Sequence, residues 1–492
     1  MLNQSQPKNH TRQAGVLMHV TSLPDGQLGP DAYRFVDKLV ELGALVWQTL
    51  PVNMPHGDQS PYQSVSAHAG HVGMISPQQL VEQGWCLHDE LNLSLPALID
   101  KAMRRVQSGG ALSRADSEGL TWSGFARFCQ THQYWLEDFA LFLSLRENHG
   151  FQSWQQWPQA YRMRDPQALH AYTAIHQEKL TLIKFTQYVF FQQWAQLKAY
   201  ANLRGVQLFG DIPIFVAYDS ADVWAQPAAF KLDANLDMTV VAGVPPDYFS
   251  ETGQRWGNPH YDWVTMQADG FKWWLGRIAV QSTLFDILRI DHFRGLQAAW
   301  EIPVSEPTAI NGSWQEAPGD ALLKAITVQF PVLRLVAEDL GIITPEVDAL
   351  RHAYALPGMK ILQFAFGGGE DNPYLPANIE ENSVAYTGTH DNDTTVGWYQ
   401  SAPEHVRQHV QHYLATDTPD MPAALVQLVM QSSADLAIVP MQDILGLDGA
   451  ARMNTPGTVD GNWGWRMQWS QLTTEQVYAF RQMVSESGRI DG

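Results

Sequence analysis

The chain has 492 residues, and 45% of them are hydrophobic, which is enough to build a large core. The formal net charge is −20, from 51 acidic and 31 basic residues, so a polyanion such as nucleic acid would be repelled while a neutral substrate would not. No run of about 18 apolar residues occurs, and we therefore expect neither a membrane span nor a membrane partner.

The chain begins with a polar segment. Residues 1–10 lack the apolar stretch of a secretory signal peptide. Cys86 and Cys129 are the only cysteines, and two thiols in a chain of this length suggest a reduced compartment without a disulfide framework. These features predict a cytoplasmic protein.

Strand-like apolar runs alternate with stretches of helical periodicity along the chain. Helical patterns occur, for example, at residues 32–42, 271–284 and 345–354. The candidate strands are residues 15–19, 44–48, 206–211, 285–291, 333–338, 360–364, 383–386 and 436–440. Eight β/α units predict an α/β fold, a (β/α)8 TIM barrel, with residues 1–492 as a single catalytic unit.

The gap between the second and third candidate strands is too long for one β/α unit. Residues 55–204 are expected to form an inserted, mainly helical subdomain, because residues 135–145 and 181–200 carry apolar side chains at helical spacing. Further loop insertions are expected at the C-terminal rim of the barrel, where such segments usually shape the substrate cleft.

Three of the strand-like runs are followed closely by a carboxylate, namely Asp291, Glu338 and Asp391. Because a parallel barrel presents the ends of its strands at one rim, we expect these carboxylates to lie together. Cleavage of a glycosidic bond uses a pair of carboxyl groups, which in retaining enzymes are about 5 to 5.5 Å apart.

Each of these motifs also has a purely structural interpretation. Arg289 and Asp291 lie on the same face of a strand and would form an ion pair whether or not they act on a substrate. Asp339 would suit a helix cap after its strand. The turn at residues 389–394 has the residue types of a metal site, but no second His cluster or Cys set accompanies it, so no metal is expected.

Aromatic residues make up 11% of the chain, with 18 Trp among them. Sugar rings have apolar faces that stack on aromatic rings, although most aromatic side chains serve the core. The segment at residues 245–259 combines aromatic side chains with amides and is interpreted as a turn-rich loop that suits polyol recognition or serves only the fold.

Together these motifs resemble the amylomaltases, the 4-α-glucanotransferases of the α-amylase clan. The similarity extends over nearly the whole chain, at residues 21–24, 47–51, 60–62, 210–215, 244–249, 289–295, 337–341, 387–394 and 462–466. It implies that α-1,4-glucan segments are transferred between maltooligosaccharides or amylose by a retaining double displacement, through a covalent glucosyl-enzyme. It implies no cofactor.

The resemblance also implies roles for individual residues. Asp291 is expected to be the nucleophile, Glu338 the acid/base, and Asp391 the third carboxylate, which holds sugar hydroxyls. Arg289 and His390 are expected to support the nucleophile and the bound ring. The positions that match substrate contacts are Ser60, Tyr62, Asp211, Asp247, Gln254, Trp256, Asp371 and Asn462.

Two departures from the family pattern are expected near the cleft. Residues 53–57 replace a common Gly-Pro-Thr-Gly turn, and the loop after Leu23 is short, so the chain-length preference is expected to differ. The nearest alternative function is that of an α-amylase-like hydrolase, but such amylases usually carry an Asn-His pair after the third strand, where this chain has Gly210-Asp211-Ile212-Pro213. A non-catalytic glucan-binding protein is the second alternative, and the presence of all three carboxylates argues against it.

Overall fold

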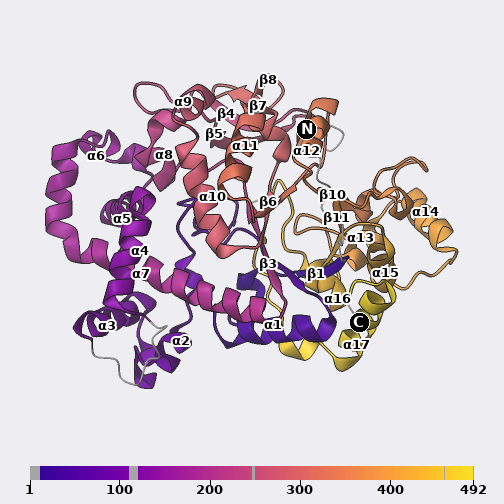
Figure 1. The fold of residues 1–492 in the computed structure, drawn as a ribbon. Coiled ribbons are helices and arrows are strands. Elements are labelled where there is room, and N and C mark those ends of the chain that lie inside the picture. The colour runs from indigo at the N-terminus through magenta and orange to yellow at the C-terminus, as the bar shows by residue number, and fades with distance from the viewer. Residues whose placement is uncertain (1–11, 110–119, 247–249, 459, 491–492) are drawn as a thin grey trace.

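The computed structural model describes residues 12–109, 120–246, 250–458 and 460–490, and its centre is a barrel of eight parallel strands surrounded by helices (Figure 1). The strands are β1 (Gln13–Leu17), β2 (Val46–Gln48), β3 (Gln207–Ile212), β6 (Ile287–Ile290), β9 (Arg334–Ala337), β10 (Gly358–Ile361), β11 (Ser383–Tyr386) and β12 (Leu436–Pro440). The prediction of a (β/α)8 TIM barrel is confirmed.

The order of the strands in the barrel is β10-β11-β12-β1-β2-β3-β6-β9. Most predicted strands differ from the observed ones only at their ends. The strand predicted at residues 360–364 begins two residues earlier, at Gly358, and ends at Ile361, because Leu362–Phe364 turns into a 3-10 helix. Strand β6 is shorter than predicted, so that Asp291 lies directly beyond its end, at Ile290.

Helices surround the barrel and cover its outer face. Pro30 starts α1 in its first turn, and Gly43 ends it in the left-handed conformation, with a φ of 75°. The helices after β1 and after β6 to β12 are α1 (Pro30–Leu42), α11 (Gly319–Gln329), α12 (Pro345–Ala353), α13 (Thr395–Ser401), α14 (Glu404–Leu414), α15 (Ala423–Gln431), α16 (Met441–Ile444) and α17 (Thr474–Glu486). None of the helices in the described part of the chain is long and apolar enough to cross a membrane.

The two ends of the described chain meet in the barrel. Strand β1 pairs in parallel with β12, and α1 packs beside α17 (Figure 1). Trp469 Nε1 donates a 2.6 Å hydrogen bond to Asp31 Oδ1, and the Arg34 guanidinium lies 4.2 Å from the centre of the Trp469 ring. The C-terminal segment is thereby fixed to the first β/α unit.

Between β2 and β3 the chain forms a group of helices that lies to one side of the barrel (Figure 1). They are α2 (Pro77–Glu82), α3 (Leu95–Ser108), α4 (Trp122–Thr131), α5 (Gln133–Asn148), α6 (Gln159–Arg162) and α7 (Pro166–Leu203). On α7, Gln187 Oε1 accepts a 2.7 Å hydrogen bond from Gly70 N, and Gln187 Nε2 donates one of 3.1 Å to Gly70 O. Gln193 bonds the amide and the carbonyl of Ser76 in the same way, at 2.8 and 2.9 Å. Helix α7 therefore holds the segment that follows Tyr62.

A second, antiparallel sheet lies beside the barrel and was not predicted. Its order is β5-β4-β7-β8, with β4 (Val240–Val244), β5 (Gln254–Pro259), β7 (Ala298–Pro303) and β8 (Ser313–Glu316). The interpretation of residues 245–259 as a loop was therefore wrong for its second half. Strand β5 is rich in polar residues and lacks apolar alternation, and Gly243 allows it to approach, since a Cβ there would lie 2.1 Å from the Gln254 carbonyl oxygen.

Between β3 and β6, the remaining helices are α8 (Ala221–Ala225), α9 (Trp263–Ala268) and α10 (Lys272–Leu284). The interior of the barrel is filled by side chains of alternating strand positions, among them Phe209, Ile287, Val336, Met359 and Ile438. This packed interior forms the floor below the C-terminal rim, where the polar residues gather.

Candidate active site

A cleft of about 950 Å³ opens at the C-terminal ends of the strands. It brings together the three carboxylates and most of the predicted contact residues. The predicted residues that line it are Ser60, Tyr62, Gln254, Trp256, Arg289, Asp291, Glu338, His390, Asp391 and Asn462. The parallel barrel explains this convergence, because residues more than 100 positions apart follow strands that end at the same rim.

Arg289 connects two carboxylates at the floor of the cleft. Its Nη2 donates a 2.7 Å hydrogen bond to Asp291 Oδ1, and its Nη1 donates a 2.6 Å hydrogen bond to Asp211 Oδ2. Burial lowers the pKa of Arg289, but the two carboxylates outweigh this effect and hold that pKa well above its ordinary value. The guanidinium is therefore a fixed positive charge beside Asp291.

Asp211 lies beneath the cleft. Its side chain is fully buried, and Oδ2 also accepts a 2.7 Å hydrogen bond from the Tyr62 hydroxyl. Its other oxygen, Oδ1, is buried and has no hydrogen-bond partner among the residues that the structure describes. Burial raises the pKa of Asp211, and the nearby Arg289 opposes that effect. The structure thus shows Asp211 as a support for Arg289 and Tyr62, and a direct substrate contact stays a prediction.

Glu338 follows β9 and is held by backbone amides. Oε2 accepts a 2.7 Å hydrogen bond from His292 N, and Oε1 accepts one of 3.3 Å from Leu340 N. Burial raises the pKa of Glu338 to about 8, against the lowering effect of Arg289 and with a further raising effect of Asp291. Such a carboxyl group keeps its proton at neutral pH and can act as a general acid.

His292 adopts the left-handed conformation, with a φ of 50°, which is uncommon for a residue other than glycine. This turn directs the backbone amide after Asp291 toward Glu338. Because the His292 amide bonds Glu338 and His292 directly follows Asp291, the main chain fixes the position of Glu338 relative to Asp291.

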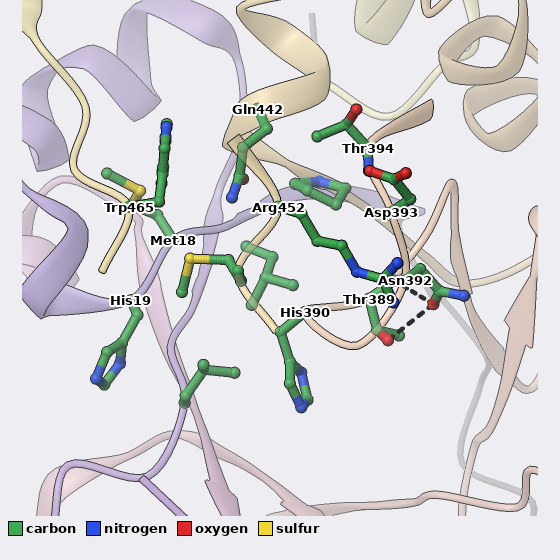
Figure 2. A pocket seen from close by; sticks show the side chains of 14 residues that line it. Met18, His19, Thr389, His390, Asn392, Asp393, Thr394, Gln442, Arg452 and Trp465 are labelled. Carbon is green, nitrogen blue, oxygen red and sulfur yellow. Dashed lines mark hydrogen bonds between the residues drawn. The ribbon is translucent and has the colours of Figure 1, made fainter. Parts of the chain in front are cut away.

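Asp391 lies on the loop after β11, and its side chain is 47% exposed to the cleft. The loop is fixed from within, because Asn392 Oδ1 accepts hydrogen bonds from Thr389 N at 2.8 Å and from Thr389 Oγ1 at 2.9 Å (Figure 2). A cavity of only about 20 Å³, with room for about one water molecule, lies behind the loop, between His390 and the segment with Met18 and His19 (Figure 2).

His390 and Tyr62 form one wall of the site. Their rings are stacked, with centroids 5.1 Å apart and an interplanar angle of 16°. His390 Nε2 lies 3.4 Å from Asp391 Oδ1. Tyr62 thus contacts the loop after β11 with its ring and the floor of the site with its hydroxyl, which makes it a bridge between two parts of the cleft.

Of the remaining predicted contacts, Gln254, Trp256 and Asn462 line the cleft. Trp256 Nε1 donates a 3.1 Å hydrogen bond to Gln254 Oε1, and its ring meets that of His292 edge-on at 4.9 Å. Asn462 accepts from Thr455 N at 2.9 Å and so shapes its own loop. Asp371 is exposed and does not line the cleft, and Asp247 lies outside the described residues.

Three further residues contact Asp391 or the wall formed by His390 and Tyr62 and were not predicted as site residues. Asn454 Nδ2 donates a 2.6 Å hydrogen bond to Asp391 Oδ1, and Arg452 Nη2 donates one of 2.7 Å to the Asp391 carbonyl oxygen. Trp463 lies 6.0 Å from both the Tyr62 and the His390 ring. Arg452 and Asn454 belong to an irregular segment that has no periodicity and gave no signal. Trp463 lies within residues 462–466, which match the family pattern, but it was not assigned a role there.

The described residues contain no group of three or more His, Cys, Asp or Glu side chains arranged to hold a metal ion. Cys86 and Cys129 are unpaired, and neither lines the cleft.

Comparisons with known proteins found a matching family model, similar sequences and a similar solved structure. Residues 18–473 match a family model described as 4-alpha-glucanotransferase. A 4-alpha-glucanotransferase from Thermus thermophilus is 44% identical over 97% of this chain and 99% of its own length, and one from Synechocystis is 44% identical over 94% and 95%. The structure of the amylomaltase from Streptococcus agalactiae in complex with acarbose is similar, with a TM-score of 0.91 and 34% identity over 98% of this chain and 100% of that one.

Proposed function

Since the chain belongs to the 4-alpha-glucanotransferase family, we propose that it transfers α-1,4-glucan segments between maltooligosaccharide or amylose chains. The observation that carries this proposal is that Asp291 and Glu338 lie at one rim in different surroundings. Arg289 donates a hydrogen bond to Asp291, whereas burial raises the pKa of Glu338. A nucleophilic carboxylate must be ionised, whereas a proton donor must keep its proton at neutral pH.

In the first step, Asp291 attacks the anomeric carbon of the donor glucan. The bond from that carbon to the glycosidic oxygen breaks, and Glu338 gives its proton to the departing oxygen. The product is a glucosyl ester of Asp291. Arg289 holds the Asp291 carboxylate in one orientation, and the loop with Asp391 grips sugar hydroxyls in the distorted ring.

In the second step, Glu338 acts as a base. It removes the proton from the 4-hydroxyl of an acceptor glucan, whose oxygen then displaces Asp291 from the anomeric carbon. Two inversions restore the α configuration. This geometry requires carboxyl groups about 5 to 5.5 Å apart, which stays a prediction for Asp291 and Glu338.

Transfer requires that a sugar reach the ester before water does. Aromatic side chains at the acceptor side raise the local concentration of sugar and exclude water. Trp256 and Tyr62 lie in the cleft, and we assign them this role. Ser60, Gln254 and Asn462 are proposed substrate contacts for the same reason, since their polar side chains line the cleft.

The proposal is tested by incubation of the purified protein with maltotriose. A transferase produces glucose together with a ladder of longer glucans. The alternative, an α-amylase-like hydrolase, produces only shorter sugars, and a non-catalytic glucan-binding protein produces no change. The variant Glu338→Gln is the control, because it removes the proton donor and leaves the shape of the site nearly unchanged. A wild-type reaction without longer glucans would contradict the proposal.

We also infer that residues 55–204 form a subdomain of the single catalytic unit and that the protein is cytoplasmic. The group of helices between β2 and β3 supports the first inference. The two unpaired cysteines support the second.

A further inference from the structure

Asp339, the residue after Glu338, is a buried carboxylate that takes no part in the two steps above. It is 7% exposed. Its Oδ1 accepts a 2.6 Å hydrogen bond from Met359 N, and its Oδ2 lies 3.3 Å from Nε of Arg351, an ion pair whose cationic side chain is 3% exposed. A buried carboxylate is costly unless such partners compensate it, so its presence here needs a reason.

The partners of Asp339 lie across a particular junction of the barrel. Strands β9 and β10 are the two ends of the strand order. They are joined by the hydrogen bond from Ala337 N to Pro357 O, at 2.9 Å, and then by the bond from Met359 N to the Asp339 side chain. A side-chain carboxylate thus does at this junction what a strand carbonyl does elsewhere, and it fixes the end of β9 against β10.

The surroundings of Asp339 are built to receive its carboxylate. A Cβ on Gly358 would lie 2.2 Å from Asp339 Oδ2, so the absence of a side chain at this position leaves the space that the carboxylate fills. Arg351 is held on α12 by hydrogen bonds to Leu356 O at 3.2 Å and to Glu380 Oε1 at 2.9 Å. The guanidinium therefore has one orientation, in which it faces Asp339.

We propose that Asp339 is a positioning residue for Glu338, which it holds at the height and angle needed to protonate the leaving oxygen. The inference rests on the proposed function, in which Glu338 is the acid/base. The two residues are consecutive, so a rotation of the main chain at Asp339 moves the Glu338 carboxyl group away from the His292 amide. A displacement of about 1 Å costs about 100-fold in rate where the reacting geometry is strict.

Two donor substrates distinguish a displaced Glu338 carboxyl group from a general loss of structure. Maltotriose loses glucose, a poor leaving group that needs the Glu338 proton. α-Maltosyl fluoride delivers the same maltosyl group to Asp291 but loses fluoride, which leaves without a proton donor. The quantity measured is kcat/KM for each donor, since it reports the formation of the ester and not its later breakdown.

The variant Asp339→Asn keeps an acceptor for Met359 N but removes the charge that faces Arg351. We expect it to lower kcat/KM for maltotriose by about 10- to 100-fold and for the fluoride by less than about threefold. Gly358→Ala, whose new methyl group displaces the carboxylate, is expected to show the same selectivity. Asp222→Asn is the matched control, because Asp222 is also buried and paired, with His68 at 2.9 Å, and its loss is expected to affect both donors equally.

The Glu338→Gln variant separates a failure of the proposed function from a failure of the inference about Asp339. Glu338→Gln must lose maltotriose turnover and keep the fluoride release of the first turnover, which forms the ester. If it does not, the proposed function is at fault and not the role of Asp339. With that control satisfied, equal losses on both donors, or no loss, in Asp339→Asn would overturn the inference. If Asp339→Asn does not fold, Gly358→Ala is judged by the same criterion. If neither folds, Asp339 serves the fold alone and the inference is wrong.

Discussion

Arg289 Nη2 and Asp291 Oδ1 are 2.7 Å apart, with Arg289 on β6 and Asp291 directly after the end of that strand. The guanidinium is also fixed from below, because Asp211 Oδ2 accepts from its other terminal nitrogen at 2.6 Å. A carboxylate that is oriented in advance needs little reorganisation when it attacks, which is the property expected of a nucleophile in this family.

The activity is expected to fall as the pH rises through about 8. The first step needs Glu338 in its protonated form, and burial raises its pKa from 4.5 to about 8. The pH profile of kcat/KM on maltotriose checks this, and the basic limb is expected to disappear with α-maltosyl fluoride, which needs no acid. A basic limb that is the same for both donors would assign it to another group.

The same pKa has a consequence for stability. A raised folded-state pKa favours folding below the unfolded value of 4.5, and this contribution is lost as the pH rises through about 8. Glu338→Gln removes the titrating group, so its free energy of unfolding is expected to gain on the wild type across this window. Denaturant unfolding at pH 5 and pH 8 measures the difference, and a constant difference would contradict the expectation.

Tyr62→Phe is expected to lower kcat/KM by about 10-fold, or about 1.4 kcal/mol. The change removes the 2.7 Å hydrogen bond to Asp211 and leaves that buried carboxylate with Arg289 as its partner. Tyr261→Phe is the matched control, because it removes a buried 2.6 Å hydrogen bond to Ile214 O that touches no carboxylate. Equal kinetic losses in the two variants would show that Asp211 is not the reason.

Asn454→Ala is expected to lower kcat/KM by about 10-fold without a comparable loss of stability. Asn454 donates a 2.6 Å hydrogen bond to Asp391 Oδ1, and without it the Asp391 side chain can turn away from the sugar. Steady-state kinetics with maltotriose measure the effect. Asn311→Ala provides the comparison, since Asn311 pairs with Glu306 on the surface, and identical kinetics in the two variants would refute the role of Asn454.

Trp256→Ala is expected to lower the ratio of transfer to hydrolysis. The side chain lines the cleft, and its loss removes an aromatic surface on which an acceptor sugar can stack while it opens the ester to water. The ratio of longer glucans to newly formed reducing ends measures the effect, and Trp256→Phe, which keeps a ring, should lie in between. An unchanged ratio in the alanine variant would remove Trp256 from this role.

The barrel was predictable because its strands are short apolar runs that alternate with stretches of helical periodicity. The positions of Asp291 and Glu338 at its rim were predictable because each residue directly follows such a run. The antiparallel sheet was not predictable in the same way, since Gln254–Pro259 is polar and β4 also pairs with β7, which follows β6 in the chain. Asn454 was missed for a related reason, because an irregular segment has no period that would show which side chains turn inward.

The contacts of Asp339 could not be predicted from the sequence around it. From the sequence it suits a helix cap, but its partners are Met359 and Arg351, which become neighbours only once the barrel forms. Asp211 is similar, since its proximity to Tyr62 depends on a segment 149 positions earlier in the chain.

The ester on Asp291 is the central element of the proposed mechanism, and it is accessible to mass spectrometry. In Glu338→Gln, α-maltosyl fluoride can form the ester, but no base remains to activate an acceptor, so the ester should accumulate. Peptide mapping is predicted to find one maltosyl group, attached to Asp291, and Asp291→Asn treated in the same way should carry none while it remains folded. A maltosyl group on another residue, or fluoride release by the Asp291→Asn variant at the same rate, would contradict the mechanism.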